Sequence, residues 1–242
     1  MSFLLLFFIF YKCHGAQPDA DTTEHTLVIS HDRWDGLLRK YVSASGTVNY
    51  KDLLREKPKL DSYLKELSET PASEAWTRNE QIAYWINAYN AFTVDLILRN
   101  YPVKSIRDLN SGKPWDDPFI HLNGKTYTLN AIENILREKF SDPRIHFAIN
   151  CASRSCPKLM NAAFNSGSLE QQLTKLTVEF INDPIKNKIA AGKIEVSPIF
   201  NWYKNDFLKY GSLIYFINKY SASKISPDAS IIYLDYDWSL NE

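Results

Sequence analysis

The sequence has few of the residues that define a disulfide-rich, metal-binding or nucleic-acid-binding protein. It contains 3 cysteines and 5 histidines in 242 residues, and its 28 basic side chains are balanced by 28 acidic ones. Binding to nucleic acid requires a concentrated basic surface, so nucleic acid is not expected as a partner. After residue 11, no apolar run approaches the ~18 residues that a transmembrane helix needs, so no later membrane span is expected.

The apolar run at residues 3–11 is typical of a secretory signal peptide. It is too short to cross a bilayer, and small side chains at Gly15 and Ala16 offer a cleavage site. We therefore predict a signal peptide at residues 1–16, a secreted or periplasmic location, a lead-in at residues 17–29 and a single globular domain at residues 30–242. Cleavage would remove Cys13 and leave two cysteines, Cys151 and Cys156.

Local patterns predict a helix-dominated α+β fold with short β-hairpins. The residues Thr77 and Glu80 form a capping box before a long apolar segment, and the pair Asn123-Gly124 is typical of a tight hairpin turn. Apolar spacing and caps predict helices at residues 30–42, 58–67, 81–101, 130–140, 168–182, 200–210 and 212–220. Alternating β-branched and aromatic residues predict strands at residues 119–129, 188–196 and 231–234.

The segment around the two cysteines is the best candidate for chemistry. A cysteine nucleophile needs its thiolate, a nearby imidazole and a group that orients the imidazole, while loop amides can stabilise an oxyanion. The candidates are Cys151 as nucleophile, His146 or His121 as base, Asn87, Glu133 or Asp206 as orienting group and the amides of residues 151–156 as oxyanion donors. A strand at residues 144–150 would place His146 and Cys151 on opposite faces, so His121 is a competing base.

Other roles for these residues stay open. An oxidising compartment favours a disulfide between Cys151 and Cys156, which a short loop can accommodate. No metal site is expected, because the spacing of His146 and the two cysteines lacks the tight pairs of structural zinc motifs. No cofactor is predicted.

A second group of residues is a candidate for binding. Asn87 and Asn90 lie three positions apart on one predicted helix, so their amides share a face and either tie loops together or line a cleft. Aromatic residues near Asp206, namely Trp202 and Tyr203, form a cluster that either packs in the core or lines a binding site.

Several motifs in a fixed order carry a family resemblance. They lie at residues 31–38, 46–50, 85–91, 146–157, 197–207 and 236–241. Together they resemble the domain-of-unknown-function 547 family, which implies a single domain that is often exported in bacteria but no established reaction. Relatives usually carry His where this chain has Asn134, and plant relatives tend to carry Ser where Cys156 stands. The second difference favours Cys151 as the functional thiol.

Two hypotheses of function follow. The first is an exported thiol-dependent hydrolase or acyltransferase with Cys151 as nucleophile, which predicts a partly exposed thiol within hydrogen-bond reach of an imidazole. The second is a non-catalytic binding or scaffolding domain for a small-molecule, peptide or glycan ligand. It predicts a Cys151–Cys156 disulfide or buried thiols, with an aromatic groove elsewhere.

Overall fold

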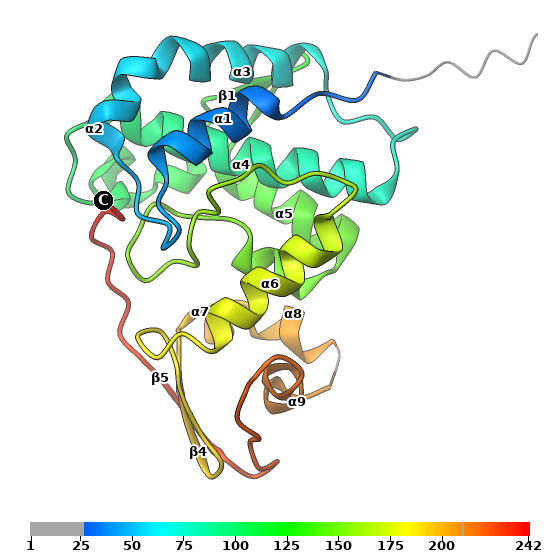
Figure 1. The fold of residues 1–242 in the computed structure, drawn as a ribbon, viewed down its shortest axis with the longest axis vertical. Helices are drawn as coiled ribbons and strands as arrows, with labels where there is room; N and C mark the ends of the chain where they lie inside the picture. Colours follow the sequence, from blue (N-terminus) through cyan, green and yellow to red (C-terminus); the bar gives the residue numbers. More distant parts are fainter. Residues whose placement is uncertain (1–26, 210) are drawn as a thin grey trace, which may run out of the picture.

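The computed structural model describes residues 27–209 and 211–242, and the predicted signal peptide lies outside them. Its fold is α+β and dominated by helices, as predicted (Figure 1). The first half contains α1 (Asp32–Tyr41), α2 (Tyr50–Leu53), η1 (Leu54–Glu56), α3 (Lys57–Glu69), α4 (Arg78–Asn100), η2 (Ile106–Asp108), η3 (Asn110–Gly112), η4 (Pro114–Asp116), β1 (Ile120–Leu122) and β2 (Lys125–Tyr127). The second half contains α5 (Leu129–Phe140), η5 (Pro143–Phe147), α6 (Leu169–Ile181), β3 (Lys188–Ala190), β4 (Lys193–Val196), α7 (Ile199–Trp202), α8 (Lys204–Leu208), α9 (Leu213–Asn218) and β5 (Ser230–Tyr233).

The long helix α4 is the central element, and α3 and α5 pack against it. Its start is fixed by the predicted capping box, in which Thr77 accepts from the Glu80 amide and Glu80 accepts from the Thr77 amide. Residues 81–98 are all buried, so α4 has no solvent-facing side until its last turn. No helix in the described part of the chain is long and apolar enough to cross a membrane.

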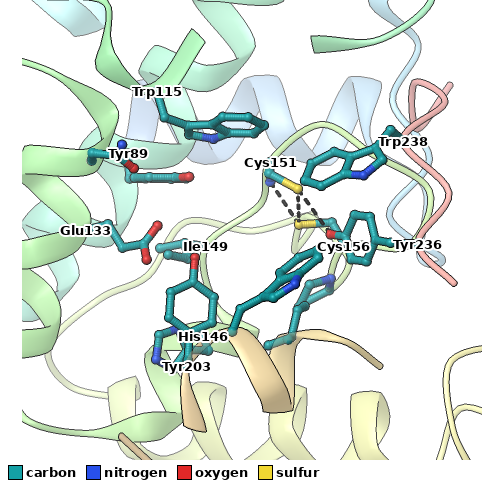
Figure 2. Close-up of a pocket in the computed structure, with 14 residues that line it drawn as sticks. Tyr89, Trp115, Glu133, His146, Ile149, Cys151, Cys156, Tyr203, Tyr236 and Trp238 are labelled. Atoms are coloured by element: carbon teal, nitrogen blue, oxygen red, sulfur yellow. Dashed lines mark hydrogen bonds between the residues drawn. The ribbon is translucent and has the colours of Figure 1, made fainter. Parts of the chain in front are cut away.

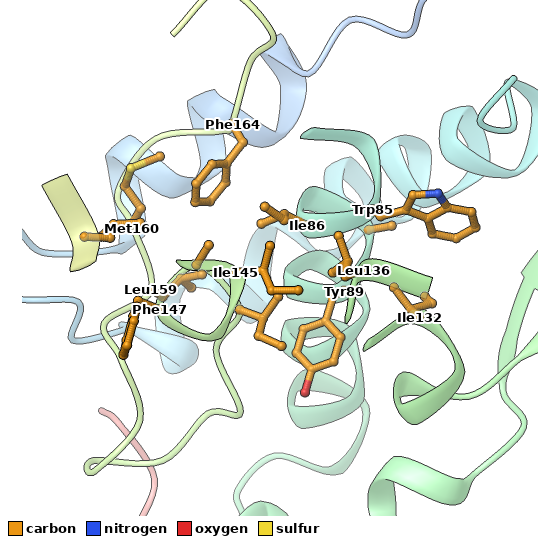
Figure 3. Close-up of a cluster of buried hydrophobic side chains, with 14 of the residues drawn as sticks. Trp85, Ile86, Tyr89, Ile132, Leu136, Ile145, Phe147, Leu159, Met160 and Phe164 are labelled. Atoms are coloured by element: carbon orange, nitrogen blue, oxygen red, sulfur yellow. The ribbon is translucent and has the colours of Figure 1, made fainter. Parts of the chain in front are cut away.

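Side chains of α4 and α5 meet in the hydrophobic core. Trp85, Ile86 and Tyr89 lie at helical spacing on α4 and approach Ile132 and Leu136 of α5 (Figure 3). The core is completed by buried residues from η5 and the loop after it, namely Ile145, Phe147, Leu159, Met160 and Phe164. Close packing of these residues holds η5 and the cysteine-containing loop in place beside α4.

Two small sheets flank the helices. β1 and β2 form the predicted hairpin, with Asn123 and Gly124 at positive φ in the turn. β3 pairs antiparallel with β4, and β5 pairs parallel with β4 on its other edge. The chain then runs from β5 back towards α2 and brings the C-terminal residues beside the cysteine loop (Figure 1).

Two local predictions were wrong in detail. The helix expected to begin with Asn130 as its cap begins at Leu129, because Thr128 is the cap and its hydroxyl accepts from the Ala131 amide, whereas the Asn130 side chain donates to Asp116. The helix expected at residues 200–210 is divided into α7 and α8, with Tyr203 at the junction, and Tyr210 lies outside the described residues.

Candidate functional site

The cysteine loop, residues 148–157, is anchored by two buried asparagines. Asn90 of α4 donates to the Ala148 carbonyl at 2.9 Å and accepts from the Asn150 amide at 2.8 Å. The Asn150 side chain accepts from the Ala152 amide at 2.8 Å and donates to the Pro157 carbonyl at 2.7 Å. These bonds hold Ala152 at φ +57°, a conformation that a residue with a Cβ adopts at some cost. Asn90 therefore has the loop-tying role, one of the two predicted for it.

The C-terminal segment closes over the same loop. Ser153 and Leu240 form an isolated antiparallel bridge, and the Arg154 amide donates to the Ser239 carbonyl at 2.9 Å. Tyr236, in the same segment, places its hydroxyl 3.3 Å from the Sγ of Cys151. Residues separated by about 85 positions in the sequence thus meet at the thiol.

Cys151 is a free, partly exposed thiol with three hydrogen-bonding neighbours. Its Sγ lies 2.8 Å from the Sγ of Cys156, 3.1 Å from the Ser153 hydroxyl and 3.3 Å from the Tyr236 hydroxyl. The disulfide predicted as an alternative is absent here, because a covalent S–S bond is about 2.05 Å long and both cysteines are free. The short loop does bring the two sulfur atoms together, but as hydrogen-bonded thiols.

The two cysteines differ in acidity. Burial raises the pKa of Cys151, but hydrogen bonds from Cys156, Ser153 and Tyr236 outweigh burial and lower the pKa to about 7. Burial raises the pKa of Cys156 well above its ordinary value, and the hydrogen bond to Cys151 raises it further. Cys156 therefore keeps its proton. In the neutral pair the Cys151 thiol donates to the Cys156 Sγ, and once Cys151 is ionised Cys156 becomes the donor.

Most of the loop amides that were candidates for oxyanion donors already have partners within the protein. The Cys151 amide donates to the Cys156 Sγ at 2.9 Å, and the Ala152 amide is taken by Asn150. The amides of Arg154, Ser155 and Cys156 donate to backbone carbonyls. The Ser153 amide is the exception, because it hydrogen-bonds to the Cys151 sulfur and helps to lower its pKa.

An aromatic cavity of about 200 Å³ opens beside Cys151. Figure 2 shows Glu133 on one side of it and Cys151 on the other, with the Trp115 indole above the space between them and Trp238 beside Cys151. Its aromatic lining comes from the loop before β1, from helices α4 and α7, from Tyr203 and from the C-terminal segment: Trp115, Tyr89, Trp202, Tyr203, Tyr236 and Trp238. The predicted aromatic cluster thus lines the cavity, and the nucleophile candidate and the aromatic groove are one site, not alternatives.

His146 also lines the cavity but is bonded elsewhere. Its Nε2 lies 2.9 Å from the Oδ2 of Asp206, which also accepts from Arg137 at 2.7 Å. The ring stacks on Tyr203 with centroids 4.0 Å apart, and its Nδ1 is buried without a hydrogen-bond partner. The hydrogen bonds of the Cys151 sulfur are to Ser153, Cys156 and Tyr236, so the expected Cys–His pair is not formed.

Charges around His146 form a small network. Burial raises the pKa of Asp206, but hydrogen bonds from His146 and Arg137 outweigh burial and leave the pKa well below its usual range. Arg137 Nη1 is also 4.0 Å from the Oε1 of Glu133. Asp206 orients the imidazole as predicted for an orienting group, while Glu133 faces the cavity itself.

The other sequence candidates lie outside the cavity. His121 is exposed on β1 and contacts Thr126, because its neighbours on the strand turn inward and it therefore turns outward. Asn87 is fully buried and bonds both the amide and the carbonyl of Phe164, at 3.0 and 2.8 Å. Asn134, where relatives carry His, is exposed on α5.

The sequence interpretation missed several residues of the site. Ser153, Tyr236 and Trp238 all belong to motifs that carried the family resemblance, so a signal was present, but spacing does not reveal that the two motifs meet. Trp115 and Tyr89 carried no signal that separates cavity lining from core packing. Within the described residues, no cluster of three or more His, Cys, Asp or Glu side chains could hold a metal ion.

Comparison with known protein families gives a match for the central segment of the chain. Residues 73–181 match the family model DUF547, described as a protein of unknown function. The predicted family is confirmed over these residues. The DUF547 match includes Cys151, Cys156, His146 and Glu133, whereas Trp202, Tyr236 and Trp238 come from the chain beyond it. No curated protein and no solved structure gave a significant match.

Proposed function

We propose that this protein is a thiol-dependent enzyme, a hydrolase or acyltransferase, in which Cys151 forms a thioester with the acyl group of its substrate. The observation that carries the proposal is a free, partly exposed thiol at the wall of an aromatic cavity, with three side chains within hydrogen-bond distance of its sulfur. A pKa of about 7 makes roughly half of Cys151 a thiolate at neutral pH, and the thiolate is the nucleophilic form.

The reaction would proceed in two balanced steps. The Cys151 thiolate attacks the carbonyl carbon, a C–S bond forms, and the C–O or C–N bond of the leaving group breaks as that group takes up a proton. Water or an acceptor then attacks the thioester, gives up a proton, and releases the acyl product together with the thiolate. The Cys156 thiol, 2.8 Å from the attacking sulfur, is the protonated group best placed to supply and recover the proton.

Side-chain hydroxyls would stabilise the oxyanion. The hydroxyls of Ser153 and Tyr236 lie 3.1 and 3.3 Å from the sulfur, and the Ser153 hydroxyl donates to that of Tyr236 at 3.2 Å. Burial raises the pKa of Tyr236 well above its ordinary value, so this phenol stays protonated and remains a donor. Preorganised donors of this kind commonly provide a large part of the rate enhancement in acyl transfer.

The test is to trap the acyl-enzyme. The purified protein is mixed with a p-nitrophenyl ester, and we expect a burst of one p-nitrophenolate per chain and an adduct of the acyl mass on the peptide that contains Cys151. Cys151→Ser should show neither the burst nor a rapidly formed adduct, while the exposed-site variant His121→Ala serves as a matched control that behaves like wild type. A protein that is folded and reduced yet gives no adduct on Cys151 would refute the proposal.

We also propose that this activity is exercised outside the cytoplasm, on the basis of the apolar run at residues 3–11 and the small residues after it. N-terminal sequencing of the protein recovered from its native host tests this. A mature chain that begins near Gln17 supports export, and an intact Met1 in a cytoplasmic fraction contradicts it.

A second candidate function, ligand binding without catalysis, is favoured by one observation. Trp202 is 48% exposed although it lines the cavity, and exposed indoles of this kind commonly form recognition surfaces. A binding domain would hold its ligand without forming the Cys151 adduct, so the trapping experiment separates the two functions.

A further inference from the structure

The cavity has an acidic side chain in its lining, and the histidine that lines it, His146, is already bonded to Asp206. Of the described residues that line it, none is lysine or arginine, whereas Glu133 presents a carboxylate and Cys151 a thiolate. The guanidinium of Arg137 is 4.0 Å from Glu133 and only 2.7 Å from Asp206. That of Arg107 lies 5.2 Å from the centre of the Trp238 ring but does not line the cavity. Lys209 Nζ also lies 3.7 Å from Asp206, so the cations of this network gather at Asp206, and no lysine or arginine of the described lining faces Glu133 from the cavity.

The position of Arg137 prevents it from entering the cavity as a counter-ion. Its guanidinium lies 4.9 Å from the centre of the Tyr203 ring, which His146 stacks against as well. Arg137 is not among the lining residues, and its Nε bond to Asp206 fixes it beside α8. The Tyr203 hydroxyl donates to the Glu133 carboxylate, but this partner is neutral, and Figure 2 shows Glu133 facing the cavity.

Indole rings surround the same space. Trp202 and Trp238 stack nearly parallel, 18° apart with centroids at 5.8 Å, and Trp115 meets Trp238 edge-on at 5.6 Å and 62°. Indole faces carry the strongest negative quadrupole of any side chain, and they attract cations that lie within about 6 Å. Aromatic walls combined with a carboxylate are the arrangement that recognises substituted ammonium groups.

We infer that the cavity recognises a small substituted ammonium group on the substrate, held between the indole rings and Glu133, with the substrate's acyl carbon directed to Cys151. This inference names the substrate class and rests on the proposed function for the bond that is broken. The binding of the cation itself depends only on the cavity. An anionic substrate would meet both Glu133 and the thiolate, and a neutral substrate would leave the carboxylate without a counter-charge.

The experiment compares choline with 3,3-dimethylbutanol, its uncharged isostere, by titrating the full chain and following tryptophan fluorescence or heat. Choline should bind at least about tenfold more tightly, because the two probes differ in charge and not in shape. Glu133→Gln should remove most of this preference by weakening choline binding and leaving the isostere unchanged. Glu138→Gln, on the exposed side of the same helix, is the matched control and should keep the preference.

A second variant keeps the test decisive if Glu133→Gln fails to fold. Trp202→Leu alters a half-exposed ring, so folding should survive, and it should reduce choline binding severalfold more than binding of the isostere. Equal binding of the two probes to the wild type, or no binding of either, would overturn the inference. Equal losses for both probes in Trp202→Leu and in Glu133→Gln would do so too.

The inference and the proposed function fail in different ways. Cys151→Ser keeps Glu133 and the indoles, so choline binding to this variant tests recognition without chemistry. Choline binding without any acyl-enzyme in the wild type would refute the enzyme and leave the cation site standing. Acylation at equal rates by choline esters and by esters of the isostere would refute the cation site and leave the enzyme standing.

Discussion

The division of roles between the two cysteines can be tested by Cys156→Ala. This change removes the S–H donor that lies 2.8 Å from the Cys151 Sγ. The hydrogen bond stabilises the charged form of Cys151, so its loss must raise the pKa of Cys151. A hydrogen bond to a charged group contributes about 1.5–3 kcal/mol. At 1.36 kcal/mol per pKa unit, the pKa should rise by roughly one to two units, because Ser153 and Tyr236 still donate.

The assay is the rate of alkylation of Cys151 by iodoacetamide between pH 5 and 10, measured on its own peptide by mass spectrometry. The wild-type midpoint should lie near 7, and the Cys156→Ala midpoint near 8 to 9. At pH 7 the thiolate fraction would then fall from about one half to between roughly a tenth and a hundredth. Cys156→Ser keeps a donor and is the matched control, with a midpoint close to the wild type.

One result would refute this reasoning. If Cys156→Ala leaves the Cys151 midpoint near 7 or lowers it, the thiolate is not stabilised by Cys156. The proton-carrier role proposed for Cys156 would then be wrong as well. A wild-type protein that is labelled only after reduction would instead show that the two thiols oxidise to the disulfide under the conditions used.

Three further predictions concern stability, each measured as the free energy of unfolding in urea. Because folding lowers the pKa of Asp206, this carboxylate stabilises the folded state fully above its unfolded pKa of about 4, and the stabilisation is lost as the pH falls further. The wild type should therefore lose more stability than Asp206→Asn between pH 4 and 2. Parallel pH profiles of the two proteins would contradict this. Asn87→Leu should cost about 2–4 kcal/mol, since it leaves the buried amide and carbonyl of Phe164 unbonded, and a cost under about 0.5 kcal/mol would show that these bonds are unimportant. Gly46→Ala should cost more than about 1 kcal/mol, because φ is +87° and a Cβ would collide with Lys158. The control Gly192→Ala has open space around the new Cβ and should cost clearly less. Equal losses of stability in the two variants would argue against the collision.

Local signals predicted much of the fold. The capping box at Thr77 and Glu80 fixes the start of α4, and Asn123-Gly124 fixes the hairpin, because each depends on residues within three positions of one another. The helix start at Thr128 was missed because two possible caps stand close together, and only the geometry shows which side chain accepts from Ala131. Sequence patterns are reliable where the stabilising contact is local.

The site was predicted less completely, because its contacts are long-range. Cys151, Glu133 and His146 were identified by residue type and motif, and all three line the cavity. The partner of His146 is 60 positions away at Asp206, and that pair was not selected over its alternatives. The hydrogen-bond partners of the loop amides could not be predicted either, since some of them belong to the C-terminal segment.

The docking of that segment also determines which part of the chain can be functional. The DUF547 match at residues 73–181 contains Cys151, the proposed nucleophile, and Glu133, but the phenol of Tyr236 and the indole of Trp238 approach from beyond it. Without Tyr236, the thiolate loses one of its three side-chain donors and the cavity loses part of a wall. The C-terminal segment is in turn held by its bonds to the cysteine loop, so neither part has its observed geometry alone. The smallest unit in which the proposed chemistry can be tested therefore extends well past the matched segment, to Trp238 and the bridge formed by Leu240.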